Sequence, residues 1–207
     1  NTDATLLMLQ SSGGVIPAAT AAQRPAFVLE SGPTAGVMSA AQLARDLDLP
    51  HVLTFDMGGT TAKAAVIKHG EPAFTPELEV GAGMSSSSRL TRGAGYLLRT
   101  PSIDLVEIGA GGGSIATVDE AGGISVGPTS AGADPGPACY GLGGRNATLT
   151  DATVVLGHIN PSSLLGSSMT LDASAAERVV EKNISRPLGT SLIEAADAVH
   201  RIASAEL

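Results

Sequence analysis

The chain has 207 residues, of which 43% are hydrophobic and only 2% aromatic, so its core must be built from Ala, Val, Ile and Leu, the usual filling of α/β layers. The net charge is −8 and Lys and Arg are not clustered, which argues against a nucleic-acid partner. No apolar run approaches the roughly 18–20 residues of a membrane span, no signal peptide opens the chain, and the single cysteine excludes an internal disulfide, so we expect a cytoplasmic protein that spans no membrane.

The first part of the chain predicts strands, one helix and a hairpin. Residues 1–30 alternate short apolar stretches with Gly-Gly and Pro, which indicates strands and loops. A turn at residues 31–34 opens a helix whose apolar residues recur at three- and four-residue spacing until Pro50. Two β-type runs follow, at residues 51–56 and 61–67, and the short Gly-Gly turn between them predicts a β-hairpin.

The later elements are predicted from short apolar runs and amphipathic patterns. Residues 85–88 form a polar loop, and the apolar run at residues 103–108 fits either a strand or a helix. The Gly- and Pro-rich residues 127–147 predict a long ordered loop. The remaining predicted elements are strands at residues 115–118 and 124–126 and helices at residues 151–156, 172–182 and 191–206.

The hairpin turn carries the residue types that hold a phosphate group. Gly58 and Gly59 have no Cβ, so their backbone N–H groups can converge on an anion, and Thr60 and Thr61 add hydroxyl donors. Asp56 ends the first strand and can approach a phosphate through Mg²⁺ or water, because two negative groups repel each other directly. The alternative is an ordinary hairpin with a Gly-Gly turn, which composition alone does not exclude.

A second Gly-rich segment, residues 109–114, has two interpretations. It lacks the Lys-Ser or Lys-Thr of a P-loop and does not fit the dinucleotide fingerprint. Its candidate site residues are Gly111, Gly112, Gly113 and Ser114, whose backbone amides could face a phosphate or a substrate carboxylate. A tight connection between strands explains the same glycines equally well.

The loop at residues 127–144 holds two further polar candidates. Its prolines restrict the backbone, so it can hold a substrate or another subunit rigidly, and Asp134 is its best site residue. Cys139 would need a base as a nucleophile, and the nearest histidine in sequence is His158, so we expect a buried small side chain instead. The four histidines are far apart in the sequence, and none pairs at zinc-motif spacing.

Four segments, in this order, give the chain a family resemblance. The hairpin motif alone resembles a phosphate hairpin of the superfamily of actin, sugar kinases and heat-shock chaperones. The whole set resembles the central part of the hydantoinase A/5-oxoprolinase family, most strongly over residues 28–161. The segments are Ser31-Gly32-Pro33-Thr34-Ala35-Gly36, Phe55-Asp56-Met57-Gly58-Gly59-Thr60-Thr61, Ile108-Gly109-Ala110-Gly111-Gly112-Gly113-Ser114-Ile115-Ala116 and Val126-Gly127-Pro128-Thr129-Ser130-Ala131-Gly132-Ala133-Asp134-Pro135-Gly136-Pro137-Ala138-Cys139-Tyr140-Gly141.

The resemblance implies an ATP-dependent hydrolase of cyclic amides such as 5-oxoproline or hydantoin. It implies ATP and Mg²⁺ as cofactors, Asp56 as a catalytic residue that reaches the metal through water, and an α/β fold of ribonuclease-H-like, actin type with a mixed sheet flanked by helices. In such chemistry, positioning and charge neutralisation at the phosphates supply most of the rate. One alternative is a subunit of an ATP-dependent acetone-type carboxylase, and another is a chaperone-like module that binds ATP for conformational change.

The chain also departs from the family pattern. Many members carry an acidic residue where this chain has Lys63, which we expect to point into solvent. The family's upstream phosphate hairpin and downstream adenosine loop are absent, so residues 1–207 predict one partial domain of a longer polypeptide, inactive alone. Its partners would be a small cyclic amide and the remaining lobes or another subunit, in a homo- or hetero-oligomer, since uncovered faces favour association.

Overall fold

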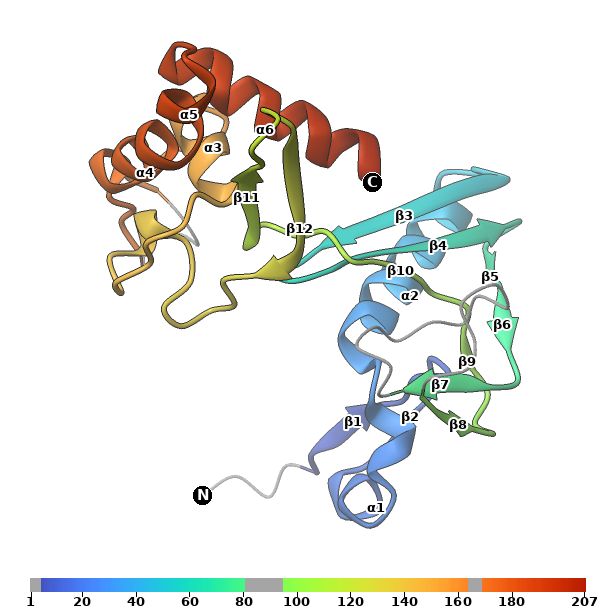
Figure 1. Ribbon diagram of the computed structural model, residues 1–207. Coiled ribbons are helices and arrows are strands. Elements are labelled where there is room, and N and C mark those ends of the chain that lie inside the picture. The colour runs from blue at the N-terminus through green and yellow to red at the C-terminus, as the bar shows by residue number, and fades with distance from the viewer. Residues whose placement is uncertain (1–4, 81–94, 164–168) are drawn as a thin grey trace. The chain divides into compact units, whose positions relative to one another are not determined.

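The computed structural model describes residues 5–80, 95–163 and 169–207, and these form a mixed α/β protein (Figure 1). The chain divides into two compact units. The first comprises Asn1–Asp56 and Lys63–Glu107, and the second comprises Met57–Ala62 and Ile108–Leu207. The tip of the predicted hairpin therefore belongs to the second unit, together with the Gly-rich segment.

The first unit is built from one long helix on a small sheet. Helix α2 (Ser31–Asp46) and the antiparallel strands β3 (His51–Met57) and β4 (Ala62–Lys68) confirm the predicted helix and hairpin. The sheet order is β10-β4-β3, and β5 (Glu71–Pro72) also pairs with β4. Strand β10 (Val106–Ile108) comes from the run that fitted either a strand or a helix.

Shorter elements complete this unit. The N-terminal region contains a strand pair as predicted, but it also contains a short helix that the sequence pattern did not indicate. The elements are β1 (Leu7–Leu9), β2 (Val15–Pro17), α1 (Ala18–Gln23), the 3-10 turn η1 (Pro25–Val28), β6 (Phe74–Thr75), β7 (Leu78–Val80), β8 (Tyr96–Leu98) and β9 (Ser102–Ile103).

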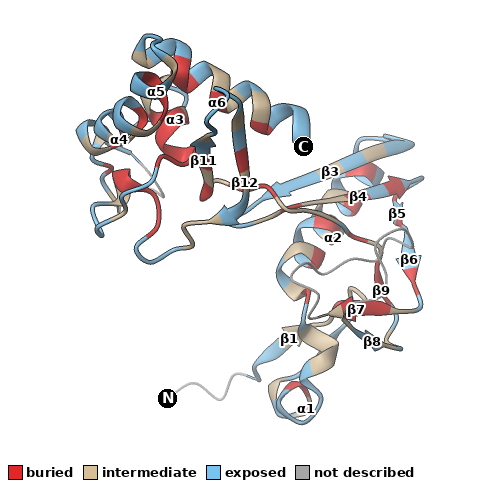
Figure 2. Ribbon diagram, in the orientation of Figure 1, coloured by how far each residue is buried: buried red, intermediate tan, exposed pale blue. Residues whose placement is uncertain are grey.

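The core of the first unit lies between α2 and the sheet. Val37, Ala41 and Ala44 recur along one side of α2 and contact Ala65 and Ile67 of β4. Figure 2 shows buried residues in red on both α2 and β4. Burying a side chain as large as Ile67 contributes roughly 1.5–3 kcal/mol, whereas the alanines contribute mainly close packing.

The second unit packs helices against the antiparallel pair β11 (Ser114–Val118) and β12 (Ile124–Ser130). Its helical elements are η2 (Ala138–Tyr140), α3 (Leu149–Val155), α4 (Ala173–Val180), the π-helical turn η4 (Glu181–Ser185), α5 (Arg186–Leu188) and α6 (Leu192–Glu206). The core joins the strands to α3, η4 and α6 through residues such as Val126, Ala152 and Val199.

Several observed elements differ from those that the sequence pattern predicts. The ordered loop is shorter than residues 127–147, because β12 continues to Ser130 and η2 interrupts the remainder. The helix predicted at residues 172–182 continues through η4 into α5. The polar loop at residues 85–88 lies outside the described residues. Within the described residues, no helix is long and apolar enough to cross a membrane.

Candidate functional site

The hairpin tip is held by hydrogen bonds to the Gly-rich segment of the same unit. Within the tip, the Gly58 amide donates to the Thr61 carbonyl at 2.9 Å. The Gly112 amide donates to the Gly58 carbonyl at 3.0 Å, and the Gly113 amide donates to the Gly59 carbonyl at 2.6 Å. Two consecutive carbonyl groups of the tip therefore point toward the Gly-rich segment.

These two hydrogen bonds, which we call the clamp, turn the next two amides of the tip outward. In a trans peptide the carbonyl oxygen and the following N–H point in opposite directions, so the Gly59 and Thr60 amides face away from the Gly-rich segment. Among the described residues, neither amide has a hydrogen-bond acceptor, and the hydroxyl groups of Thr60 and Thr61 have none either. Gly58, Gly59 and Thr60 are exposed. The tip thus presents unpaired donors, which is the chemistry that a phosphate group requires.

The Gly-rich segment contacts the tip so closely that side chains do not fit. A Cβ at Gly111 would lie 2.7 Å from the Thr60 carbonyl carbon and 2.8 Å from the Thr61 nitrogen. A Cβ at Gly113 would lie 2.8 Å from the Gly59 carbonyl oxygen. Because these are backbone atoms, either substitution would displace the tip itself. At Gly59, in contrast, a Cβ would meet no atom within 4 Å.

The amides of the Gly-rich segment are used inside the protein. Those of Gly112 and Gly113 bind the tip, and the Gly111 amide donates to Ser114 Oγ at 2.9 Å. Ser114 is itself buried. The amides of Gly111, Gly112 and Gly113 therefore all have acceptors within the protein, and a direct role for this segment at a phosphate stays a prediction. The segment positions the donors at Gly59 and Thr60.

Helix α3 supports this segment from the other side. The amide and the hydroxyl of Thr150 both donate to the Gly112 carbonyl at 2.8 Å. The next residue, Asp151, is fully buried and caps α3 reciprocally with Thr148. Its carboxylate also accepts from the amides of Ala138 and Cys139, at 3.2 and 2.9 Å. Asp151 therefore fixes the loop of residues 127–144, a role that sequence alone left unassigned.

The two carboxylates that the sequence singled out are both exposed. Asp56 lies on β3 directly before the tip, where its carboxylate is accessible to a hydrated cation. Asp134 lies in the loop of residues 127–144. The Ala131 amide of this loop donates to the Gly113 carbonyl at 2.8 Å and so joins the loop to the Gly-rich segment. No hydrogen bond or ion pair to Asp134 is found among the described residues.

Cys139 is buried, as expected, and is no nucleophile in this structure. Its side chain is fully inaccessible. Burial, followed by the nearby negative charge of Asp151, raises the pKa of its thiol far above the ordinary value. His158 packs edge-on against His200 with ring centroids 5.0 Å apart and not against this thiol. Among the described residues, no group of three or more metal-ligating side chains gathers.

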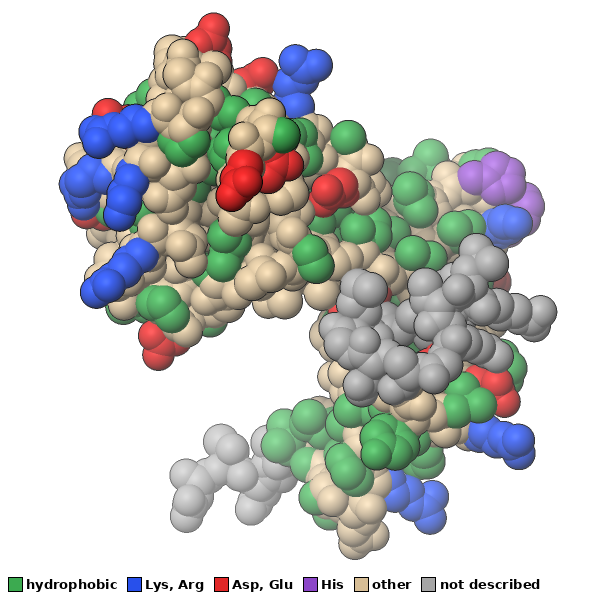
Figure 3. Space-filling view, in the orientation of Figure 1, with side chains coloured by type: hydrophobic (Ala, Val, Ile, Leu, Met, Phe, Trp, Pro, Cys, Tyr) green, Lys and Arg blue, Asp and Glu red, His purple; other side chains and the backbone are tan. Residues whose placement is uncertain are grey.

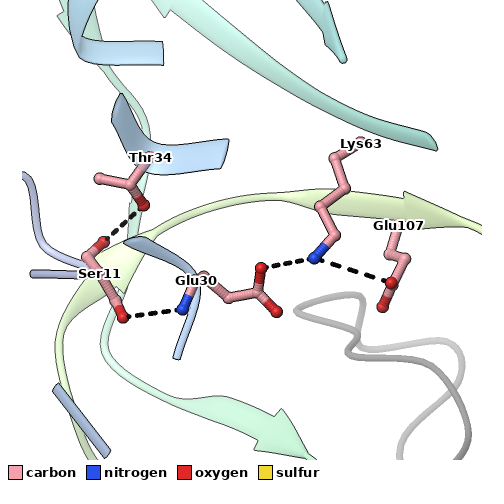
Figure 4. Close-up of polar contacts among 5 residues, drawn as sticks. All are labelled: Ser11, Glu30, Thr34, Lys63 and Glu107. Atoms are coloured by element: carbon pink, nitrogen blue, oxygen red, sulfur yellow. Dashed lines mark hydrogen bonds and ion pairs between the residues drawn. The ribbon is translucent and has the colours of Figure 1, made fainter. Parts of the chain in front are cut away.

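Lys63 does not point into solvent, contrary to the expectation from sequence. Its ammonium lies 2.5 Å from the carboxylate of Glu30 and 3.7 Å from that of Glu107 (Figure 4). The side chains of Lys63, Glu30 and Glu107 are 16%, 10% and 8% exposed. The Ser11 hydroxyl accepts from the Glu30 amide at 3.3 Å and so fixes the start of α2. Residue spacing gave no sign of this cluster, because its members come from three separate elements.

Together, the fold and the clamped tip define a mixed α/β protein built around a glycine hairpin with unpaired donors. The sequence profile described as hydantoinase/oxoprolinase matches residues 1–207, and the chain belongs to that family. It is 38% identical to the caprolactamase subunit alpha of Pseudomonas jessenii, over 90% of this chain and 25% of that protein. It is 36% identical to the acetophenone carboxylase gamma subunit of Aromatoleum aromaticum, over 95% of this chain and 25% of that subunit.

A solved structure shares the fold over almost all of the chain. The nucleotide-free structure of acetone carboxylase, from work on ATP-dependent acetone carboxylation, superposes with a TM-score of 0.81 at 28% identity. It covers 99% of this chain and 27% of that one. This chain therefore spans about a quarter of the length of these three relatives.

Proposed function

We propose that this chain supplies one phosphate-binding hairpin to the ATP site of an enzyme that opens a cyclic amide of the 5-oxoproline or hydantoin type. The observation that carries the proposal is the tip itself. Its carbonyl groups accept hydrogen bonds from the Gly-rich segment, and its Gly59 and Thr60 amides are turned outward, with no acceptor in the part of the chain that the structure describes. The family membership and the likeness to a caprolactamase subunit support a cyclic amide as the substrate.

In this proposal the tip residues have distinct roles. Gly58 allows the turn, the Gly59 and Thr60 amides bind phosphate oxygens, and the Thr60 and Thr61 hydroxyls add donors. Asp56 holds Mg²⁺ through water, which fits a lone exposed carboxylate, since Mg²⁺ at phosphate sites usually keeps several waters. ATP would phosphorylate an oxygen derived from the ring carbonyl and so make the carbon a better electrophile. The proposal includes the actin-type fold, and it leaves the isolated chain inactive.

The test compares two glycine substitutions in the full-length polypeptide. Gly59→Val places a side chain where the phosphate would lie, without meeting protein atoms. Gly32→Val is the control, since a Cβ at Gly32 also meets nothing within 4 Å. Calorimetric titration with Mg·ATP should show at least about a tenfold loss of affinity for Gly59→Val, the effect of about 1.4 kcal/mol, and no loss for Gly32→Val. Equal Mg·ATP affinities of the two variants would show that the tip is not part of the nucleotide site.

A carboxylase subunit is the second candidate, favoured by the likeness to acetophenone and acetone carboxylases. The two candidates differ in their products. A hydrolase would convert a lactam to the open amino acid with ATP and no bicarbonate. A carboxylase would need bicarbonate and a ketone, and its subunits would copurify with the full-length polypeptide.

A further inference from the structure

The cluster of Lys63, Glu30 and Glu107 differs from every other ion pair between described residues. The basic side chains of the other pairs are between 40% and 86% exposed, and Figure 3 shows Lys and Arg side chains that project from the surface. Lys63 is only 16% exposed, and both of its carboxylate partners are less exposed still. Two buried carboxylates therefore face one ammonium, so the cluster carries more acceptor groups than its single cation satisfies.

Glu107 has the clearest unused hydrogen-bonding capacity. Its Oε2 atom is buried and has no hydrogen-bond partner in the part of the chain that the structure describes. Its Oε1 atom lies 3.7 Å from the Lys63 ammonium, which is beyond hydrogen-bond distance. The ammonium has three N–H donors and makes one hydrogen bond among the described residues, to Glu30. An unsatisfied buried acceptor beside an unused donor is rare in native proteins, and a functional reason is expected for it.

This donor and this acceptor fit one edge of a cyclic amide. In a small ring the amide is cis, so its C=O and N–H groups point to the same side, whereas an open-chain secondary amide is trans and they point to opposite sides. The oxygen and nitrogen of an amide are about 2.3 Å apart. Hydrogen bonds of about 2.9 Å from these two atoms reach a donor and an acceptor 3.7 Å apart with little splay. The separation of Lys63 and Glu107 therefore suits a cis amide.

The surroundings of Lys63 also suit a small ring. Lys63 lines a groove of about 440 Å³, together with Thr54 and Asp56, and the remaining lining residues are apolar or glycine. Leu105, two positions before Glu107, lines the same groove. Small-molecule sites combine a volume of this size with apolar walls and a few placed polar groups. A cyclic amide has the matching division, with one hydrogen-bonding edge and apolar CH₂ groups in the ring.

We propose that this cluster binds the cyclic amide. The Lys63 ammonium donates to the ring carbonyl oxygen, the Glu107 carboxylate accepts from the ring N–H, and Glu30 holds Lys63 in place (Figure 4). Lys63 follows Thr61 of the tip by two residues, which span at most about 7 Å of chain, so the bound carbonyl stays close to the tip. The inference rests on the proposed function, because it names the residues that select the substrate of that site.

Methylation of the ring nitrogen tests the N–H contact. In the full-length polypeptide, kcat/KM for ring-dependent release of phosphate from ATP is measured with 5-oxoproline, with hydantoin and with derivatives methylated on the nitrogen of the amide that is opened. We expect methylation to lower kcat/KM by at least about a hundredfold, because a site that binds an N–H group rejects an analogue without it. N-methylacetamide, an open-chain amide, should not stimulate phosphate release. Equal kcat/KM for a parent ring and its methyl derivative would overturn the proposal.

Substitutions at Glu107 separate this contact from a steric effect of the methyl group elsewhere. Glu107→Met keeps the side-chain length, removes the acceptor and leaves Lys63 paired with Glu30 alone. We expect it to raise the KM of the parent ring at least about tenfold and to reduce the methylation penalty to less than about tenfold. Glu107→Gln keeps an acceptor and should retain part of the preference. Ser102→Ala is the matched control, because Ser102 Oγ is the other buried side-chain atom without a partner among the described residues.

The affinity for Mg·ATP separates a failure of this inference from a failure of the proposed function. It should be equal in Glu107→Met and the unsubstituted protein, and a loss would assign Glu107 to the nucleotide site and overturn the inference. An undiminished methylation penalty in Glu107→Met would also overturn it. If Glu107→Met does not fold, Glu107→Gln decides, and a penalty equal to that of the unsubstituted protein is the contrary result. If no ring stimulates phosphate release, the inference and the choice of substrate both fail, while Gly59→Val still decides the nucleotide site.

Discussion

At the scale of single residues, Lys63 balances two carboxylates that would otherwise be buried without a cation. Removing one partner of a buried ion pair leaves an uncompensated charge, which costs more than the pair contributes. We expect Lys63→Met to destabilise the full-length polypeptide by about 3 kcal/mol in urea unfolding. The Lys63 ammonium lies 2.5 Å from the Glu30 carboxylate and 3.7 Å from the Glu107 carboxylate. Since Glu30 is the nearer partner, the double variant Lys63→Met/Glu30→Gln should regain part of the lost stability. A double variant as unstable as the sum of both single variants would contradict this interpretation.

The same residues show what sequence can and cannot predict. The sequence predicted phosphate donors at the amides of Gly58 and Gly59 and at the hydroxyls of Thr60 and Thr61. In the structure the Gly58 amide donates to the Thr61 carbonyl, and phosphate binding by the other groups stays a prediction. The Gly-rich segment was ambiguous, since the same glycines suit close approach to a ligand or to another backbone. The structure shows close contacts of Gly111 and Gly113 with the backbone of the tip, which explain why a side chain does not fit at these two positions. Lys63 was misjudged because its partners, Glu30 and Glu107, lie 33 and 44 positions away in the chain.

At the scale of elements, local patterns worked where one element carried its own signal. The repeating apolar residues of α2 and the Gly-Gly turn between β3 and β4 predicted these elements nearly to their ends. Helix α1 was missed, because six residues of Ala, Thr and Gln carry no apolar stripe. The strand character of β10 depended on pairing with β4, which tertiary structure decides and local sequence does not.

Helix α6 provides a prediction of pH dependence. The Glu194 carboxylate accepts from the Ser191 amide at 2.9 Å and from its hydroxyl at 2.8 Å, in a capping box. These hydrogen bonds, the amide bond first, lower the pKa of Glu194 below its ordinary value of 4.5. The charged form is therefore favoured in the folded state. Its contribution is complete above pH 4.5 and is lost as the pH falls through the lower, folded pKa.

Thermal unfolding of the full-length polypeptide checks this prediction. Glu194→Ala should melt lower than the unsubstituted protein at neutral pH, and the difference should shrink on acidification below pH 4.5. Glu177→Ala, at an exposed position on α4, serves as the control. A difference that stays constant with pH would show that the charge of the Glu194 carboxylate does not contribute to the stability of the helix start.

At the scale of the whole molecule, the two units each have a core of their own, yet the first leaves apolar surface uncovered. Val37, Ala41 and Ala44 cover one face of the sheet, whereas Val66 and Val106 remain 44% and 51% exposed. Large exposed apolar patches on a soluble protein mark interaction sites or aggregation sites. In a polypeptide of the length of the caprolactamase subunit or of acetone carboxylase, we expect this surface to be covered by the additional residues.

This surface predicts how the 207-residue chain behaves by itself. With the edge of β3 free, we expect association that increases with concentration, because unpaired apolar edges template further strands. Sedimentation velocity over a wide concentration range measures it. Replacing Leu53 and Phe55 by lysine should suppress association, since charge on an edge strand opposes edge-to-edge pairing. Ile193→Lys removes an equally exposed apolar residue of α6 and is the control. Two results would show that the chain does not associate through the β3 edge. One is a single monomeric species at every concentration, and the other is association that Ile193→Lys alone abolishes.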